Sequence, residues 1–517
     1  MKRSILALTL LCVQLGAQSI SLSPLGSYRD GAFDEGAAEI VAHDPATHRL
    51  FVVNGGKKSV DILDARDPMR ITRISTLEIP AAAGDAPNSV AVNNGIVAVA
   101  MQAAPATNPG FVAFFRAADG VFLKALQVGS LPDMVTFTPD GTKVLTANEG
   151  EPSDDWLTDP EGTVSIIDVS KGIDATTQAD VRTADFRAFT VGSLPAGVRI
   201  FGPANRTITV ANNVEPEYIA VTPDSRTAYV TLQENNAVAV VNLETATVTS
   251  IRPLGTKAHW LEGNAMDASD RDGGIQIRQW TVWGMYQPDT IAGYTAADGN
   301  FYLVTANEGD ARDYDAFSEE ARVADLNLDP RFYPDPTGLK QAAELGRLTV
   351  TNATGDDDGD GDIDRIHAFG ARSFSIWDAN ARLVYDSGNA LEQAHQADFP
   401  LFFNVSNSNN TFENRSDDKG PEPEAIAIGT VNGRTYAFIG NERQSNIVVY
   451  DITDPANSRY VGQWWNRDFR ANVQTAAAGD LGPEGIIFIS AENSPNGRPL
   501  LVVANEISGT TTIWQIN

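Results

Sequence analysis

The sequence predicts an all-β fold: a seven-bladed β-propeller whose N- and C-terminal strands close one blade, with long loop insertions forming a cap on one face. One unit recurs seven times in the 517 residues. The unit begins with an acidic residue that follows a small residue or proline. A short apolar strand, a turn and a second strand that ends near Asn-Glu come next, and a third strand with alternating apolar residues closes the unit. A fourth candidate strand follows every copy but the last, and ISLSPLGSY (20–28) is a spare strand for that place. The alternative fold is a pair of β-sandwiches, in which the apolar–polar alternation of the strands would match the repeat by coincidence.

Insertions hide the repeat. Its turns, such as TPDGTK and TVNGRT, have the composition of hairpin connections. In the fifth copy the first two strands, 288–309, are separated from the third, 373–379, by the largest insertion, 310–372. Two more insertions occupy about 171–215 and 256–286, and together the three predict the cap. The copies cover 38–65, 87–117, 132–170, 216–244, 288–379, 423–453 and 483–516.

The first 17 residues resemble a secretory leader. Lys2 and Arg3 precede an apolar run too short to span a membrane, and cleavage is expected near Ala17. The single cysteine, Cys12, lies within this leader, so the mature chain has no disulfide. We therefore expect a secreted protein, extracellular or periplasmic, with one propeller domain over 18–517 and no transmembrane segment.

The net charge of −29 excludes some partners. An acidic protein repels nucleic-acid phosphates and anionic membrane surfaces, so neither is an expected partner. The carboxylates either keep the chain solvated or bind cations. We expect a monomer that binds a small anionic ligand or a surface partner.

Acidic residues open the first strand in six of the seven copies, and the second copy has Asn88 there. The first strand of each propeller blade lines the central channel, so these side chains should gather at one channel mouth. Converging carboxylates repel one another unless they bind cations or retain protons. The six channel carboxylates are Glu39, Asp133, Glu217, Asp289, Glu424 and Glu484.

A second acidic set closes the following strand in five copies. We expect it at the opposite end of an antiparallel neighbour, away from the first set. The channel carboxylates have two interpretations: they bind metal or substrate, or each accepts backbone N–H bonds and fixes a turn between blades. The second set is Glu149, Glu234, Glu308, Glu442 and Glu506.

The segment GDDDGDGDIDRIH (355–367) has the spacing of a calcium loop. Acidic residues fall at positions 1, 3, 5 and 9 and Gly361 at position 6, which suits the hard oxygen ligands and sharp turn of a Ca²⁺ site. Position 12 is His367 instead of glutamate, so the last ligand must come from elsewhere. A solvated acidic turn is the alternative. The predicted calcium ligands are Asp356, Asp358, Asp360, Asp362 and Asp364.

Arginines beside acids suggest an alternative function. Arg312, Arg372 and Arg443 could hold a phosphate ester while metals polarise its oxygens and activate water. Their other interpretation is as ion-pair partners of neighbouring acids. No catalytic motif such as G-x-S-x-G, a P-loop or H-E-x-x-H is present, so the nucleophile is unassigned and catalysis is uncertain.

Long stretches spread over the chain resemble the bacterial choice-of-anchor I domain. Among them are LVTANEGDARDYDAFSEEARV, RSDDKGPEPEAIAIG and LGPEGIIFISAENSPNGRPLLVVANEISGTTTI. The resemblance implies a secreted or surface propeller, often fused to an anchoring module, which this sequence lacks after its last strand. Members are often labelled alkaline phosphatase. The first hypothesis is therefore a calcium-binding surface propeller that binds a ligand or partner, and the second a metal-dependent phosphoesterase.

Overall fold

Seven four-stranded antiparallel sheets make up most of the molecule. The computed structural model describes residues 20–517, so the predicted leader lies outside the described residues. The sheets are β2 (Val41–Asp44), β3 (Arg49–Asn54), β4 (Ser59–Asp64) and β5 (Thr72–Thr76); β6 (Ala86–Asn93), β7 (Ile96–Gln102), β8 (Pro109–Arg116) and β9 (Phe122–Ser130); β10 (Pro132–Phe137), β11 (Lys143–Asn148), β12 (Thr163–Asp168) and β13 (Val181–Asp185); β14 (Pro216–Val221), β15 (Thr227–Leu232), β16 (Ala237–Asn242) and β17 (Thr247–Pro253); β20 (Ile291–Thr295), β21 (Phe301–Asn307), β27 (Ser373–Asp378) and β28 (Leu383–Asp386); β29 (Pro423–Val431), β30 (Arg434–Asn441), β31 (Asn446–Asp451) and β32 (Arg459–Trp464); and β33 (Pro483–Ile489), β34 (Leu500–Asn505), β35 (Thr510–Ile516) and β1 (Leu22–Arg29).

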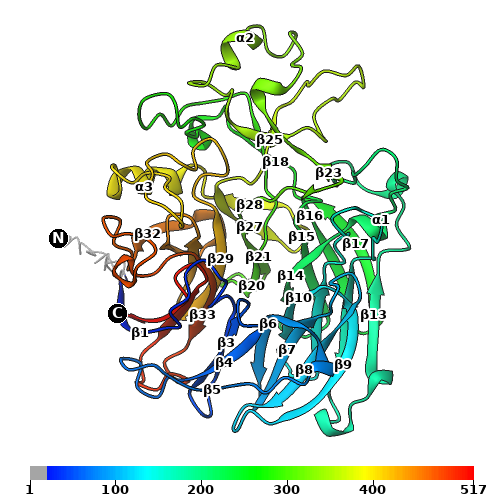
Figure 1. The fold of residues 1–517 in the computed structure, drawn as a ribbon, viewed down its shortest axis with the longest axis vertical. Coiled ribbons are helices and arrows are strands. Elements are labelled where there is room, and N and C mark those ends of the chain that lie inside the picture. Colours follow the sequence, from blue (N-terminus) through cyan, green and yellow to red (C-terminus); the bar gives the residue numbers. More distant parts are fainter. Residues whose placement is uncertain (1–19) are drawn as a thin grey trace, which may run out of the picture.

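The sheets are arranged in a ring (Figure 1). The first strand of each sheet contacts the first strand of the next, in the order β2, β6, β10, β14, β20, β29, β33 and back to β2. Radially repeated four-stranded sheets are the architecture of a β-propeller, so the predicted all-β class is confirmed.

The two ends of the described chain close the ring. β1 pairs antiparallel with β35, from Leu22 opposite Ile516 to Arg29 opposite Thr510. The last sheet therefore takes its fourth strand from the N-terminal side, as the spare strand at 20–28 predicts. Leu22 and Ile516 are both buried in one apolar cluster that this closure completes.

Alternating strand residues pack against two different neighbours. In β3, Phe51 and Val53 contact the β6–β9 sheet, whereas Leu50 and Val52 contact the β33–β35 side. All four are buried, and each such side chain contributes about 1.5–3 kcal/mol. Strands apolar on both faces thus hold adjacent sheets together.

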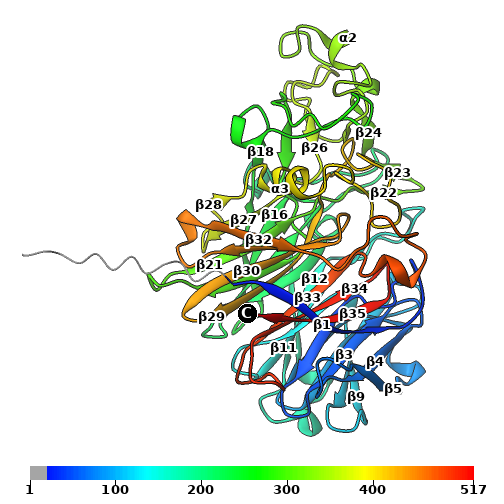
Figure 2. The ribbon, with the colours of Figure 1, turned by 90° about the vertical axis from the view of Figure 1, so that its left-hand side faces the viewer.

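Two of the predicted insertions form a unit of their own. Residues 256–286 and 310–372, which we call the inserted module, build a five-stranded sheet around a core that includes Val282, Leu345 and Val350. This sheet stands at one edge of the ring in both ribbon views (Figures 1 and 2). Its strands are β18 (Thr256–Ala258), β19 (Trp283–Met285), β26 (His367–Ala368), β25 (Thr349–Thr351) and β24 (Glu320–Arg322).

Other short elements complete the fold. A two-stranded ribbon also interrupts 310–372, and a helix follows β28. No helix of residues 20–517 is long and apolar enough to cross a membrane. These elements are β22 (Asp313–Tyr314), β23 (Phe317–Ser318), α1 (Val210–Asn213), α2 (Pro336–Leu339) and α3 (Ala390–Asp398).

The predicted insertion at 171–215 is wrong in its first part. Residues 181–185 form β13, the fourth strand of its sheet. This outer strand, VRTAD, buries only Ala184 and is mostly polar. It therefore lacks the apolar alternation by which the sequence indicates a strand. The true excursion follows β13 and runs to β14.

Candidate acidic metal site in the central hollow

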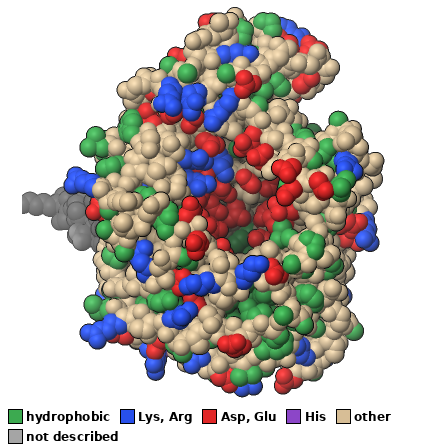
Figure 3. Space-filling view, in the orientation of Figure 1, with side chains coloured by type: hydrophobic (Ala, Val, Ile, Leu, Met, Phe, Trp, Pro, Cys, Tyr) green, Lys and Arg blue, Asp and Glu red, His purple; other side chains and the backbone are tan. Residues whose placement is uncertain are grey.

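The predicted channel carboxylates converge. Five of the six line one cavity of about 280 Å³, together with the side chain of Asn88 from the second sheet. Figure 3 shows acidic side chains gathered in a hollow at the centre of the ring. The lining acids are Glu39, Asp133, Glu217, Asp289 and Glu484.

Glu424 joins members of the second acidic set. Carboxylate oxygens of Glu424, Glu308 and Glu442 lie within 4.8 Å of one another. The start of each first strand faces the end of the second strand, as Pro423 faces Asn441 and Pro132 faces Asn148. The prediction that the two sets lie at opposite ends is therefore wrong, because an antiparallel hairpin brings the start of one strand beside the end of the next. We call the two sets together the acidic hollow.

A backbone irregularity positions most of the first-strand acids. The strand register shifts between Pro132 and Met134, between Pro423 and Ala425, and between Pro483 and Gly485, and in each case the acid is the residue between. The same shift occurs around Asn88 and around Glu217. A β-bulge leaves one residue out of the ladder and redirects its side chain. Proline is compatible with this place because it donates no ladder hydrogen bond.

The asparagine before each second-strand glutamate has a structural role. Asn148 is buried, and its amide donates to the hydroxyls of Thr163 (3.1 Å) and Ser165 (2.9 Å) while its oxygen accepts from Thr146. Asn307 donates to Ser375 at 2.8 Å in the same way. In these Asn-Glu pairs, asparagine therefore ties neighbouring strands together and glutamate faces the hollow.

The channel carboxylates have few partners. Among residues 20–517, no backbone N–H donates to any of the six, and Asp289 accepts only the Thr290 hydroxyl, at 3.0 Å. The interpretation that they fix turns by accepting backbone N–H bonds is thus not supported. The Glu39 carboxylate lies in space that glycine leaves free, since a Cβ on Gly55 would lie 2.5 Å from Glu39 Oε1.

Burial and mutual repulsion perturb these acids. Burial, with the negative charges of Glu506 and Asp133, raises the pKa of Glu39 to about 8. Burial raises the pKa of Asp133 to about 6. The pKa values of Glu217, Asp289, Glu424 and Glu484 lie well above the ordinary range, from burial first and neighbouring carboxylates second. Without cations, the hollow must retain protons near neutral pH.

Lysine and arginine side chains pair with only some of the acids in the hollow. Lys419 Nζ lies 2.9 Å from Glu308 and 3.4 Å from Glu422, and Arg443 lies 3.0 Å from both Glu422 and Glu442. Within the described range, no Lys or Arg pairs with Glu39, Asp133 or Glu217. These three carboxyl groups must therefore retain protons or bind cations from solution.

Two of the arginines predicted to bind phosphate are buried in ion pairs. Arg312 is 1% exposed, pairs with Glu215 at 2.9 Å and donates to the carbonyl of Asn213 at 2.6 Å. Arg372 pairs with Glu392 at 2.6 Å and donates to the carbonyls of Ser416 and Asp418. Arg443 is partly exposed but pairs with Glu422 and Glu442. These contacts favour the ion-pair interpretation over phosphate binding.

The predicted calcium loop brings its aspartates together as two groups. Oxygens of Asp356, Asp358 and Asp360 lie within 4.8 Å of one another on the surface. Asp362 and Asp364 form a second group with Asp329 from a segment that the sequence pattern did not indicate. A parallel bridge between Leu328 and Ile363 positions Asp329.

Arg331 lies between these groups. Its Nη2 is 3.0 Å from Asp358, 3.6 Å from Asp360 and 3.7 Å from Asp364. The loop backbone is also ordered by its own acids, since Asp356 accepts N–H bonds from Gly359 and Gly361. The loop carboxylates thus lie close enough together to share a cation. The guanidinium of Arg331 occupies the same oxygens and would compete with that cation.

Comparison with known proteins identifies the family. The model of the choice-of-anchor I domain matches residues 39–455. The chain belongs to the choice-of-anchor I family. Gigasin-3a of Magallana gigas is 30% identical over 194 residues, which are 34% of this chain and 66% of that protein. A mesenchyme-specific cell surface glycoprotein of Strongylocentrotus purpuratus is 29% identical over 284 residues, 48% of this chain and 36% of that protein. The matches span less than two thirds of either relative's length.

Solved structures of related shape are distant in sequence. Hydrazine synthase of Kuenenia stuttgartiensis superposes with a TM-score of 0.47 at 14% identity, covering 94% of this chain and 98% of that one. A streptogramin B lyase gives a TM-score of 0.46 at 10% identity, covering 96% and 98%.

Proposed function

We propose that this choice-of-anchor I chain is a secreted or cell-surface, calcium-binding propeller of seven blades whose acidic hollow binds divalent cations and, through them, an anionic or hydroxyl-rich ligand. The seven sheets are its blades, the region 18–517 is one monomeric domain, and the inserted module walls one side of the hollow. The leader-like start and the cell-surface relative from S. purpuratus support the location.

One observation carries the proposal: carboxylates from all but one of the seven sheets face a single hollow without enough cationic partners. Oxygen ligands in flexible arrangements are what Ca²⁺ prefers, and six to eight of them surround each ion. Eleven carboxylates supply enough oxygens for more than one ion. Calcium would replace the protons that burial otherwise forces these groups to retain.

Ligand binding follows from the shape of the site. The carboxylates approach from the walls, and the hollow is open on the face seen in Figure 3. A cation held from the walls keeps coordination positions for oxygens of another molecule. Phosphoesterase activity is not favoured, because the candidate arginines are paired with acids and no nucleophile of residues 20–517 lies in a recognisable catalytic arrangement.

The test is calcium binding by a double variant, Glu217→Gln with Glu424→Gln, which removes two buried charges from different blades with little change in shape. We expect calorimetric titration to show fewer Ca²⁺ ions bound per chain than in the unaltered protein. The matched control is Glu244→Gln, which removes an exposed charge paired with Arg226 at the surface and should leave binding unchanged.

Equal calcium stoichiometry in the double variant and the control would refute the proposal. Calcium-dependent hydrolysis of p-nitrophenyl phosphate that EDTA abolishes would instead favour the phosphoesterase.

A further inference from the structure

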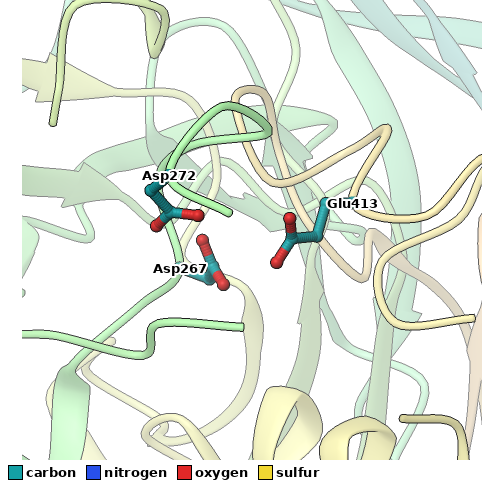
Figure 4. Close-up of side chains that lie close together, drawn as sticks. All are labelled: Asp267, Asp272 and Glu413. Carbon is teal, nitrogen blue, oxygen red and sulfur yellow. The ribbon is translucent and has the colours of Figure 1, made fainter. Parts of the chain in front are cut away.

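A second acidic cluster lies outside the acidic hollow. Asp267 and Asp272 come from the inserted module, and Glu413 comes from the segment between α3 and β29. Oxygens of the three side chains lie within 4.8 Å of one another. Figure 4 shows their carboxylates pointing toward one another from two separate segments.

The glutamate in this cluster lacks a partner. Glu413 is 2% exposed, and its Oε1 is buried without any hydrogen-bond donor. An acceptor buried without a donor costs about 1–3 kcal/mol, more when it is charged. Such an atom, aimed at two other carboxylates, calls for a cation or a proton.

No side-chain cation pairs directly with the cluster, and Arg278, which acts on Asp272 at longer range, pairs with Glu344. Within residues 20–517, no Lys or Arg forms an ion pair with Asp267, Asp272 or Glu413. The nearby arginines are committed elsewhere: Arg347 contacts Asp270 and Asp417, and Arg372 contacts Glu392. Burial, with neighbouring acids, raises the pKa of Asp267 to about 7 and that of Glu413 to about 8.

Backbone contacts hold Asp267 in place. Its carboxylate accepts N–H bonds from Gln276 at 2.7 Å and Ser269 at 3.3 Å. Its own N–H donates to Glu392 of α3 at 3.2 Å, and Arg372 donates to its carbonyl oxygen. The aspartate is therefore oriented before any ligand binds.

We infer that Asp267, Asp272 and Glu413 bind a calcium ion that fastens the inserted module to the ring segment between α3 and β29. Ca²⁺–oxygen distances of about 2.3–2.6 Å let one ion touch oxygens up to about 5 Å apart, which matches this cluster. Water and backbone carbonyls complete the coordination.

The test is hydrogen exchange measured by mass spectrometry, with CaCl₂ or with EDTA. Calcium should slow exchange of peptides covering 264–278 and 403–418 in the unaltered protein. The variants Glu413→Gln and Asp272→Asn should lose this slowing, with calcium affinity at the site falling about tenfold or more, because a direct ligand should matter at least as much as an outer-shell one. Asp272 is less buried than Glu413, so the Asp272→Asn variant still tests the site if Glu413→Gln folds poorly.

Two controls separate this site from the acidic hollow. Asp325→Asn, at an exposed acid of the inserted module outside the cluster, should keep the calcium-dependent slowing. The double variant Glu217→Gln with Glu424→Gln should also keep it, even if calcium binding in the hollow is lost. The inference is refuted if calcium leaves both peptides unchanged, which would indicate a shared proton instead. It is equally refuted if the slowing persists in both site variants.

Discussion

Neighbouring glutamates in the hollow have opposite properties because of their partners. Burial alone would raise the pKa of Glu422, but Lys419, Arg415 and Arg443 outweigh it and lower that pKa to about 2. Two residues later, burial and the surrounding acids raise the pKa of Glu424 well above the ordinary range. The available cations therefore stabilise one carboxylate and leave the next to bind something else.

The sequence could not distinguish structural arginines from ligand-binding ones. The acids beside Arg312 in the chain suggest a ligand-binding residue, but its ion-pair partner, Glu215, is 97 positions away. The repeat does not single out Glu422, because only the fourth copy has another acid at the same position, Glu215. Ion pairs between distant segments depend on packing, which local patterns do not report.

Replacing Arg312 with methionine should destabilise the protein without acting on phosphate binding. Removing one partner of a buried pair leaves Glu215 uncompensated, at a cost of about 3–5 kcal/mol. Chemical denaturation measures this change. Arg226→Met, at an exposed pair, should change stability by about 0.5 kcal/mol or less. Equal stability of the two variants would contradict a structural role for Arg312.

At the scale of elements, the repeat predicted most strands well. The spare first strand, the interrupted fifth copy and the acids at strand starts all have the expected places. Three features escaped: the bulge that redirects each acid, the shared location of the two acidic sets, and β13. A bulge depends on strand pairing, and β13 is an outer strand with too few apolar residues to alternate.

The predicted calcium loop, residues 355–367, leads to a prediction at this scale. Arg331 lies among the loop aspartates, so it competes with a bound cation for the same oxygens. Arg331→Gln should therefore tighten calcium binding at the loop severalfold, and the gain should shrink at high ionic strength because the site is exposed. Hydrogen exchange of a peptide covering 353–366 during a calcium titration measures it.

The matched control for this change is Arg365→Gln. Arg365 lies in the same loop but pairs with Asp357, outside both aspartate groups. Its replacement should affect calcium binding less than that of Arg331. Weaker binding after Arg331→Gln would mean that the arginine organises the loop instead of competing for it.

For the whole molecule, ring closure and charge are linked. Seven sheets can close only if their first strands meet around one axis, and this brings the strand-start acids into one small volume. Part of the net charge of −29 is therefore concentrated by the topology itself. The fold is stable only if protons or cations accompany these carboxylates.

The concentration of carboxylates in the acidic hollow predicts how the stability of the protein depends on pH. Burial and neighbouring charges raise the pKa of Glu39 and Glu442 to about 8, whereas the same groups in the unfolded chain titrate near 4.5. Between these values the native state holds protons that the unfolded state has released, so its stability falls as pH rises. His259 and His395, whose pKa values burial lowers to about 3, reduce stability chiefly below about pH 6.5. The interval from pH 6.5 to 8 therefore reports the carboxyl groups.

In EDTA, the thermal midpoint should fall between pH 6.5 and 8. Calcium should raise the midpoint, because binding at a free concentration 100 times the dissociation constant adds about 2.7 kcal/mol to the free energy of unfolding. At a fixed calcium concentration the gain should be larger at pH 8 than at pH 6.5, because calcium has fewer protons to displace at pH 8. The double variant Glu217→Gln with Glu424→Gln should show a smaller fall, since amides do not titrate and fewer charges then repel. A midpoint in EDTA that rises over this interval would show that the carboxylates are compensated within the protein and need no cation.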